Sequence, residues 1–147
     1  MLNKEVLDYH LNVLTSKKQE IDFEHFCRRI AEQEICPSLV VQTGPTGGGD
    51  SKADSENYPV SERISNRWYQ GTSINSEERW AFAFSAKREW RSKVRADVKS
   101  LASTKRGYKL IHFITNQYVR DKTRAEVEDQ LTAKYGIRVC IFDRNWL

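Results

Sequence analysis

The sequence lacks any long hydrophobic run. No apolar stretch approaches the roughly 20 residues that a membrane-spanning helix needs, and the first 14 residues, MLNKEVLDYHLNVL, mix charged with apolar side chains, unlike a signal peptide. Charged residues make up 30% of the 147 residues and hydrophobic residues 39%, which is typical of a globular protein. We therefore expect a single cytoplasmic domain, residues 1–147, that does not contact a membrane.

Cysteine and histidine are also scarce. The three cysteines are odd in number, and their spacing fits neither a disulfide framework nor a zinc knuckle, so we expect reduced, mostly buried thiols at Cys27, Cys36 and Cys140. The three histidines are scattered along the chain and predict no zinc site. His112, inside the apolar segment LIHFIT, is expected to be a hydrogen-bonded core histidine.

The mild net charge of +4 conceals a strongly basic segment. Residues 87–109 contain nine Lys or Arg against Glu89 and Asp97, a local charge of +7, which leaves −3 for the remainder of the chain. A segment of this charge predicts an anionic partner such as nucleic acid.

Hydrophobic periodicity predicts helices and strands in alternation. We expect helices over 3–15, 22–35, 89–103 and 120–136, and strands over 38–43, 55–60, 79–87, 108–116 and 137–143. Asp22 is predicted to cap the second helix, Thr123 and Glu126 have the spacing of a capping box, and Gly136 is predicted to end the last helix. The strand–helix alternation of the second half requires parallel neighbours, so the predicted fold is α/β, with a mixed sheet between helices.

A glycine-rich loop, QTGPTGGGDSKAD, covers residues 42–54. Its segment GPTGGGDS matches the phosphate-binding pattern G-x-x-x-x-G-K-[ST] except that Asp50 stands where the lysine is needed, and this negative charge would repel a phosphate. The alternative is a metal site, because the loop brings Asp50 and Asp54 together with glycines that permit a tight turn. Asp50 is interpreted as a turn residue or as a second ligand.

The strand RWAFAFSAK predicts a partner for that acidic loop. Ser85 and Lys87 share one face of the strand with only alanines beside them, which leaves room for an ion and a phosphate. A lysine projecting from a buried strand is costly unless a carboxylate, a phosphate or a metal-bound water meets it.

The order of these segments along the chain resembles the PD-(D/E)xK nucleases, especially the Mrr-like restriction endonucleases. The segments are the helix with Phe23 and Glu24, the string GGDSKAD, the strand ending in SAK, and the basic helix. The resemblance covers residues 22 to about 143 and implies a restriction-endonuclease-like fold with an αβββαβ core. It also implies an endonuclease that depends on Mg²⁺ or Mn²⁺ and cleaves double-stranded DNA. The catalytic residues it implies are Asp54, Lys87, Glu24 and Ser85.

The metal ligands implied by the resemblance are Asp54, Glu24, Glu56 and the backbone carbonyl of Ala86. Ser85 departs from the family, which usually has Glu or Gln at this position. Because a hydroxyl is a weak metal ligand, either Glu24 or Glu56 supplies the second carboxylate or the site holds fewer ions.

The strings QTGPTGGGD, RWAFAFSAK and DVKS are also similar to nuclease domains at the N-terminus of bacterial antiphage defence proteins, including STAND-type NTPases. This similarity implies an effector domain belonging to a larger protein with sensor or NTPase domains, and the apolar ending FDRNWL suits a domain of that kind. Control of the nuclease by fused domains or by homo-oligomer assembly is expected.

The predicted basic helix offers a surface for DNA. Its candidate phosphate contacts recur about every fourth residue and are Arg88, Arg91, Arg95 and Lys99. The alternative, that these residues form a solvated helix face, stays open.

Two functions remain at this point. The first is a metal-dependent endonuclease, and the second, favoured by Ser85, is a catalytically silent relative that binds nucleic acid or mediates assembly.

Overall fold

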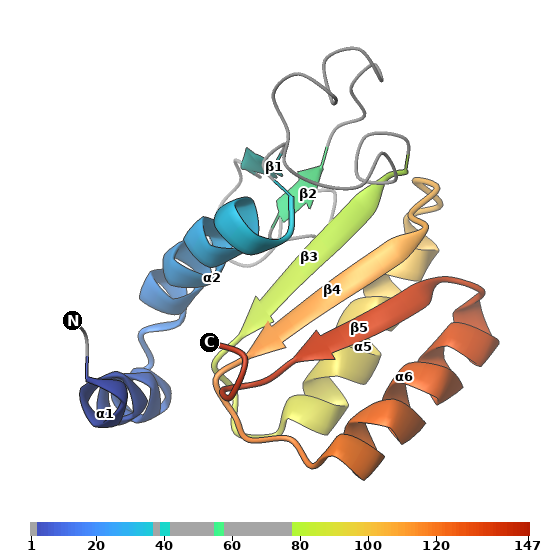
Figure 1. The fold of residues 1–147 in the computed structure, drawn as a ribbon. Coiled ribbons are helices and arrows are strands. Elements are labelled where there is room, and N and C mark those ends of the chain that lie inside the picture. The colour runs from blue at the N-terminus through green and yellow to red at the C-terminus, as the bar shows by residue number, and fades with distance from the viewer. Residues whose placement is uncertain (1–2, 37–38, 42–54, 58–77) are drawn as a thin grey trace.

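The computed structural model describes residues 3–36, 39–41, 55–57 and 78–147, which form a mixed α/β fold (Figure 1). The elements in chain order are α1 (Lys4–Ser16), α2 (Glu20–Glu34), β1 (Leu39–Val41), β2 (Ser55–Asn57), β3 (Trp80–Ser85), α5 (Trp90–Ser103), β4 (Leu110–Thr115), α6 (Asp121–Tyr135) and β5 (Arg138–Phe142).

The five described strands form one mixed sheet in the order β1-β2-β3-β4-β5. β1 and β2 pair antiparallel, as do β2 and β3, with Ser55 opposite Phe82. β3, β4 and β5 run parallel, and α5 and α6 provide the crossovers between them. The mixed sheet predicted from the sequence is therefore confirmed.

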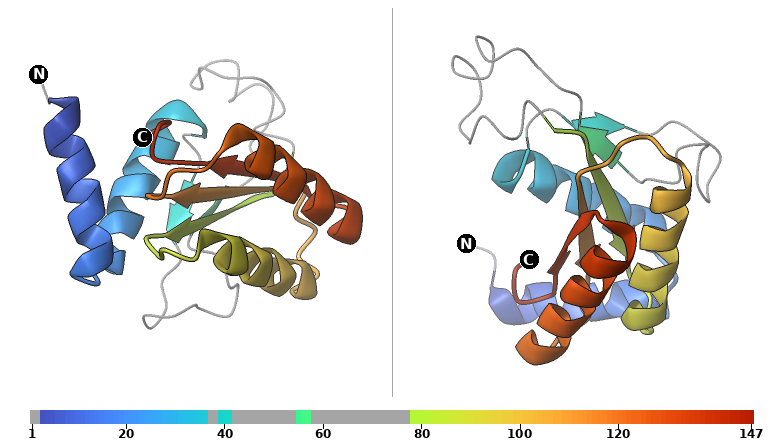
Figure 2. Two further views of the ribbon diagram at one scale, coloured as in Figure 1. Left: turned by 90° about the horizontal axis from the view of Figure 1, so that it is seen from below. Right: turned by 90° about the vertical axis from the view of Figure 1, so that its right-hand side faces the viewer.

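Both faces of the central strand β3 are covered by helices, as predicted for a sheet that lies between helices. Every residue of β3 is buried. Figure 2 shows α2 on one side of the sheet and α5 with α6 on the other. The large side chains Trp80, Phe82 and Phe84 pack with α2, whereas the small side chains Ala81 and Ala83 pack with α5.

The crossover helices bury the faces that their periodicity predicted. The side chains that α5 buries are Trp90, Val94, Val98 and Leu101, and those that α6 buries are Val127 and Leu131. Gly136 ends α6 with φ of 68°, a left-handed conformation that glycine adopts without strain, as predicted. None of the described helices is both long and apolar enough to cross a bilayer.

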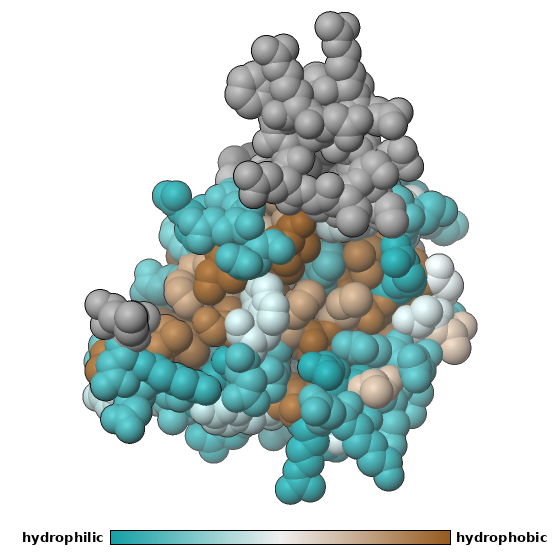
Figure 3. Space-filling view, in the orientation of Figure 1, coloured by the Kyte–Doolittle hydropathy of each residue, from teal (hydrophilic) through white to brown (hydrophobic). Residues whose placement is uncertain are grey.

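On the α2 side, the sheet is partly covered by the end of the chain itself. The rings of Phe142 and Trp146 lie 4.5 Å apart, and both residues pack with Leu147 against the cluster that contains α2 and β3. Hydrophobic side chains are visible on this face between α2 and β5 (Figure 3). The thiols follow the expectation of mostly buried cysteines, since Cys27 and Cys36 are buried and Cys140 is partly buried.

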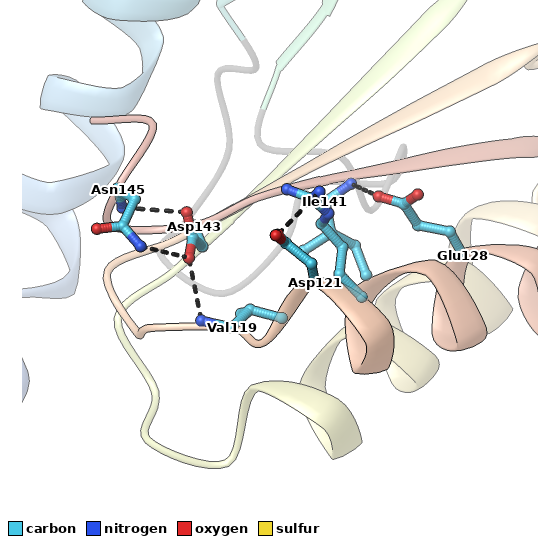
Figure 4. A network of polar contacts seen from close by, with 7 residues as sticks. Val119, Asp121, Glu128, Ile141, Asp143 and Asn145 are labelled. Atoms are coloured by element: carbon cyan, nitrogen blue, oxygen red, sulfur yellow. Dashed lines mark hydrogen bonds and ion pairs between the residues drawn. The ribbon is translucent and has the colours of Figure 1, made fainter.

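The outer edge of β5 is closed by side chains of α6. Glu128 Oε1 accepts a hydrogen bond from the backbone N–H of Ile141 at 2.8 Å (Figure 4), and Thr132 Oγ1 accepts one from Val139 at 3.3 Å. Unpaired N–H groups on an edge strand invite pairing with another chain. These two contacts therefore protect the edge of the sheet.

Two predicted helix caps are wrong. α2 begins one turn earlier than expected, with Gln19 at its N-cap, so Asp22 lies within its first turn. α6 has Arg120 at its N-cap without a side-chain hydrogen bond, so Thr123 lies inside the helix and forms no capping box with Glu126. Neither observed N-cap residue makes a side-chain hydrogen bond, so neither helix start carries the polar cap that the sequence pattern relies on.

Candidate active site

Lys87 lies just beyond the carboxyl end of β3. The strand ends at Ser85, whose partner on β4 is Thr115, so the prediction of a strand through residue 87 is wrong at its end. Ser85 is buried, whereas Lys87 is exposed. The lysine therefore incurs no penalty for burial inside the sheet, and its ammonium group is free to meet a partner from solvent.

The backbone around Lys87 is held by hydrogen bonds. The Ala86 carbonyl accepts a hydrogen bond from Thr15 Oγ1 of α1 at 2.7 Å, and Lys87 N donates to Ser85 Oγ at 3.2 Å. A carbonyl oxygen has two lone pairs, so the Ala86 oxygen retains capacity for a second partner such as a metal ion. The Ser85 hydroxyl is already engaged with the backbone.

Glu24 contributes a partly buried carboxylate from α2. Burial raises its pKa above the ordinary value, and the nearby Glu20 carboxylate raises it further. The positive charges of His25, Lys93 and Arg28 act in the opposite direction. Lys93 belongs to α5, so charged groups from helices on opposite faces of the sheet interact here.

Asp97 on α5 is a second partly buried carboxylate, and sequence reasoning missed it as a site residue. Its Oδ1 forms an ion pair with Lys93 Nζ at 2.6 Å. Burial raises the pKa of Asp97, while the hydrogen bond and charge of Lys93 and the charge of Lys87 lower it. Asp97 Oδ2 is buried and has no hydrogen-bond partner within the described ranges. The one local feature of the sequence that could have pointed to Asp97 is its i,i+4 spacing from Lys93, which favours an ion pair on a helix.

Glu24, Lys87, Lys93 and Asp97 form what we term the edge cluster. Lys93 forms an ion pair with Asp97, its charge also lowers the pKa of Glu24, and the charge of Lys87 lowers the pKa of Asp97. β3 pairs with β4 along one edge. Along its other edge, the described residues of β2 pair with two residues of β3, Ala81 and Phe82. The edge cluster therefore joins both helix layers near the carboxyl end of the central strand.

The acidic loop belongs to the part of the chain that the structure does not describe. Asp50 and Asp54 lie outside the described residues, so the predicted convergence of Asp54 with Lys87 stays a prediction. Glu56 lies in β2 opposite Ala81, but only its backbone is described. Within the described ranges, no group of three or more His, Cys, Asp or Glu could hold a metal ion. Metal binding by Glu24, Asp54, Glu56 and the Ala86 carbonyl therefore stays a prediction.

No protein-family model matches the chain, and no curated protein sequence matches it. The function is therefore inferred from the edge cluster and its surroundings.

Four basic residues, one just before α5 and three on it, lie in solvent as predicted. Arg88, Arg91, Arg95 and Lys99 are all exposed, and we term them the basic stripe. Arg95 Nη2 donates to Gln130 Oε1 of α6 at 3.0 Å, which orients one member of the stripe. Since Arg88 directly follows Lys87 in the chain, the stripe begins beside the edge cluster.

His112 is separate from this site. It is buried as predicted, with its ring stacked on Phe82 at 4.7 Å and on Phe142 at 5.6 Å. The expected hydrogen bond is not observed, because neither ring nitrogen has a partner among the residues that the structure describes. Burial, and secondarily the charge of Arg138, lower its pKa from 6.5 to about 4. His112 is thus a neutral core residue.

Proposed function

We propose that the protein is a metal-dependent endodeoxyribonuclease of the PD-(D/E)xK superfamily, Mrr-like branch, that cleaves double-stranded DNA. The order of elements from α2 through β1, β2, β3 and α5 to β4 supports this proposal, because it follows the αβββαβ core of that fold. The change from antiparallel pairing of β1, β2 and β3 to parallel pairing of β3 and β4 is also consistent with it.

The observation that carries the proposal is the position of Lys87. An exposed lysine follows a fully buried strand and interacts electrostatically with a partly buried carboxylate, Asp97. Glu24 joins the same edge cluster through Lys93. Carboxylates beside a lysine suit hydrolysis of a phosphodiester, where negative charge develops on the phosphoryl oxygens.

In the proposed chemistry, Lys87 orients the attacking water and stabilises the negative charge that develops on the phosphate. Glu24, Asp54, Glu56 and the Ala86 carbonyl would hold Mg²⁺ or Mn²⁺, since all are oxygen donors of the kind these ions prefer. When bound, the ion would polarise the phosphate and make water more acidic.

The basic stripe would grip the DNA backbone. Contacts between arginine or lysine and phosphates give affinity without sequence information. Because the stripe starts at the residue after Lys87, a backbone lying along α5 would present a phosphate to the edge cluster. In its biological setting we propose a cytoplasmic effector domain of a bacterial antiphage defence protein, controlled by fused domains or by homo-oligomer assembly.

The test is plasmid cleavage by the purified chain. We expect nicking of plasmid in Mg²⁺ or Mn²⁺ that EDTA abolishes, and a loss of about 100-fold or more in rate for Lys87→Ala. Lys122→Ala removes the same charge from an exposed position on α6 and should cleave at the parental rate. Cleavage by Lys87→Ala at the parental rate would contradict the proposal.

A second candidate function is a catalytically silent module that binds nucleic acid or mediates assembly. Ser85 favours it, because this residue replaces the Glu or Gln that the family usually has and its hydroxyl already accepts a hydrogen bond from Lys87 N. This candidate predicts retarded migration of DNA in a gel with no cleavage in either metal. Cleavage and gel-migration assays on one preparation of the protein therefore distinguish the two candidate functions.

A further inference from the structure

The peptide group between Ala86 and Lys87 is held at both ends. Its carbonyl oxygen accepts the hydrogen bond from Thr15 Oγ1, and its N–H donates to Ser85 Oγ. A peptide group is planar, and its carbonyl and N–H point in opposite directions within that plane, so hydrogen bonds to both restrict its orientation. The backbone from which the Lys87 side chain projects is thereby restricted as well.

The direction of the Thr15 hydrogen bond follows from its other partners. Asn116 Nδ2 lies 2.8 Å from Thr15 Oγ1 and also 2.6 Å from the Leu11 carbonyl oxygen, which can only accept. Asn116 Nδ2 therefore donates to both atoms. Gln117 Nε2 likewise donates to Thr15 Oγ1 at 3.2 Å and to Asn116 Oδ1 at 2.9 Å. With its oxygen accepting from two amides, the Thr15 hydroxyl must give its single hydrogen to Ala86.

This network is partly buried and is joined to the segment that follows β5. Asn116 is completely buried, and its backbone carbonyl accepts from Arg144 Nε at 2.6 Å. Arg144 Nη2 also donates to Asn12 Oδ1 of α1 at 2.8 Å. Both amide hydrogens of Asn116 and both of Gln117 have acceptors. Loss of the Thr15 hydroxyl would therefore leave two amide donors and one carbonyl without this partner, which is costly even in a partly buried site.

We propose that Thr15 and Ser85 are positioning residues that clamp the Ala86–Lys87 peptide group and so aim the Lys87 ammonium group at the reacting phosphate. This inference rests on the proposed nuclease function. It gives α1 a role in the active site and gives Ser85 a role that a carboxylate would perform less well. A hydroxyl bonds the N–H two residues later without adding negative charge beside the lysine.

The experiment compares Thr15→Val, which removes the hydroxyl at nearly constant shape, with Thr15→Ser, which retains it. We expect the kcat of plasmid cleavage to fall between about 10-fold and about 100-fold in Thr15→Val, because a small misplacement of a reacting group has effects of this size. KM for DNA should change little, since the basic stripe is untouched. Thr15→Ser should restore kcat to within about threefold of the parent.

A second readout does not depend on cleavage. Amide hydrogen exchange at Lys87 should be about 10-fold faster in Thr15→Val and in Ser85→Ala, because either change releases one end of the clamped peptide. If Thr15→Val does not fold, Ser85→Ala tests the other end of the same peptide. If the parent chain fails to cleave DNA, the proposed function fails while exchange at Lys87 still decides whether the clamp exists.

Two controls separate positioning from general destabilisation. Asn12→Ala removes the contact of α1 with Arg144 without touching Ala86, and Ser16→Ala removes a neighbouring hydroxyl that bonds Val13 within its own helix. Both variants should keep the parental kcat and the parental rate of amide hydrogen exchange at Lys87. Unchanged kcat and unchanged Lys87 exchange in Thr15→Val would overturn the proposal, as would equal losses in Thr15→Val and Asn12→Ala.

Discussion

His112 combines a titratable ring with a fully aromatic environment. Phe82 and Phe142 stack on the ring, and Trp80 meets it edge-on at 5.1 Å. The neutral imidazole packs well there, whereas the imidazolium would be a buried charge with no partner among the described residues. Protonation of this one side chain is therefore coupled to unfolding.

We predict that the protein becomes less stable as pH falls, because of His112. Its pKa is lowered to about 4 in the folded protein against 6.5 for the ordinary group, first by burial and then by Arg138. The unfolded state thus binds more protons between these two values, so the stabilisation is complete above pH 6.5 and is lost as pH falls towards 4. The free energy of unfolding, measured in urea, should decrease by about 3 kcal/mol across this interval.

Substitution of the ring tests the assignment. His112→Phe keeps an aromatic side chain without a titratable group, so most of this decrease should disappear. His10→Gln removes an exposed histidine and should leave the decrease unchanged. An identical loss of stability with falling pH in His112→Phe and in the parent chain would show that another group is responsible.

At the scale of single residues, the sequence predicts burial well and partners poorly. Ala81 and Ala83 were correctly predicted to share one face of β3, since alternate side chains of a strand point in the same direction. The bond from Thr15 to Ala86 joins positions 71 apart, and no local pattern encodes it. His112 was correctly predicted as buried but wrongly as hydrogen-bonded for the same reason.

At the scale of elements, Glu128 of α6 protects the edge strand β5. Its carboxylate is the acceptor for the N–H of Ile141, which points away from the sheet. We predict that Glu128→Ala lowers the free energy of unfolding by about 1–2 kcal/mol, because a hydrogen bond to a charged acceptor is lost. The open edge should also increase self-association, visible by size-exclusion chromatography at rising protein concentration.

The neighbouring residue supplies the matched control for this edge. Asp129→Ala removes the same charge from an exposed position on the same helix and should change neither stability nor association appreciably. If Glu128→Ala and Asp129→Ala behave alike, charge rather than edge protection explains the effect.

The existence and order of the described helices and strands were predictable, but their ends were not. Apolar periodicity located α5 to within one residue, because Trp90, Val94 and Val98 repeat at helical spacing. The carboxyl end of β3 was predicted two residues too late, because it depends on pairing with Thr115, a property of the neighbouring strand. The same error placed Lys87 in the buried strand, whereas the residue lies in the exposed segment beyond it.

At the scale of the whole molecule, the edge cluster unites three parts of the chain that the sequence presents separately. α2 supplies Glu24, the turn after β3 supplies Lys87, and α5 supplies Lys93 and Asp97. The chemistry of Glu24 and Lys87 was inferred from a resemblance, whereas Lys93 and Asp97 emerged only once both helix layers were placed about the sheet. The contribution of the loop around Asp54 stays a prediction.

The uneven charge of the molecule predicts how it binds DNA. Residues 87–109 carry +7 while the rest carries −3, and the basic stripe is exposed on α5. Simultaneous substitution of Arg91, Arg95 and Lys99 by alanine should weaken DNA binding and reduce its salt dependence. Each lost phosphate contact should make the slope of log affinity against log salt concentration shallower by about 0.9, as measured by fluorescence anisotropy with a labelled duplex.

A triple variant with the same change in charge distinguishes the stripe from net charge alone. Lys4, Arg29 and Lys122 are exposed on three other helices, and their substitution by alanine also removes three positive charges. Release of counterions requires direct contact with phosphates, so this control should retain the parental slope. Equal slopes for the two triple variants would mean that DNA does not lie along α5, and the path proposed from the stripe to Lys87 would then be wrong.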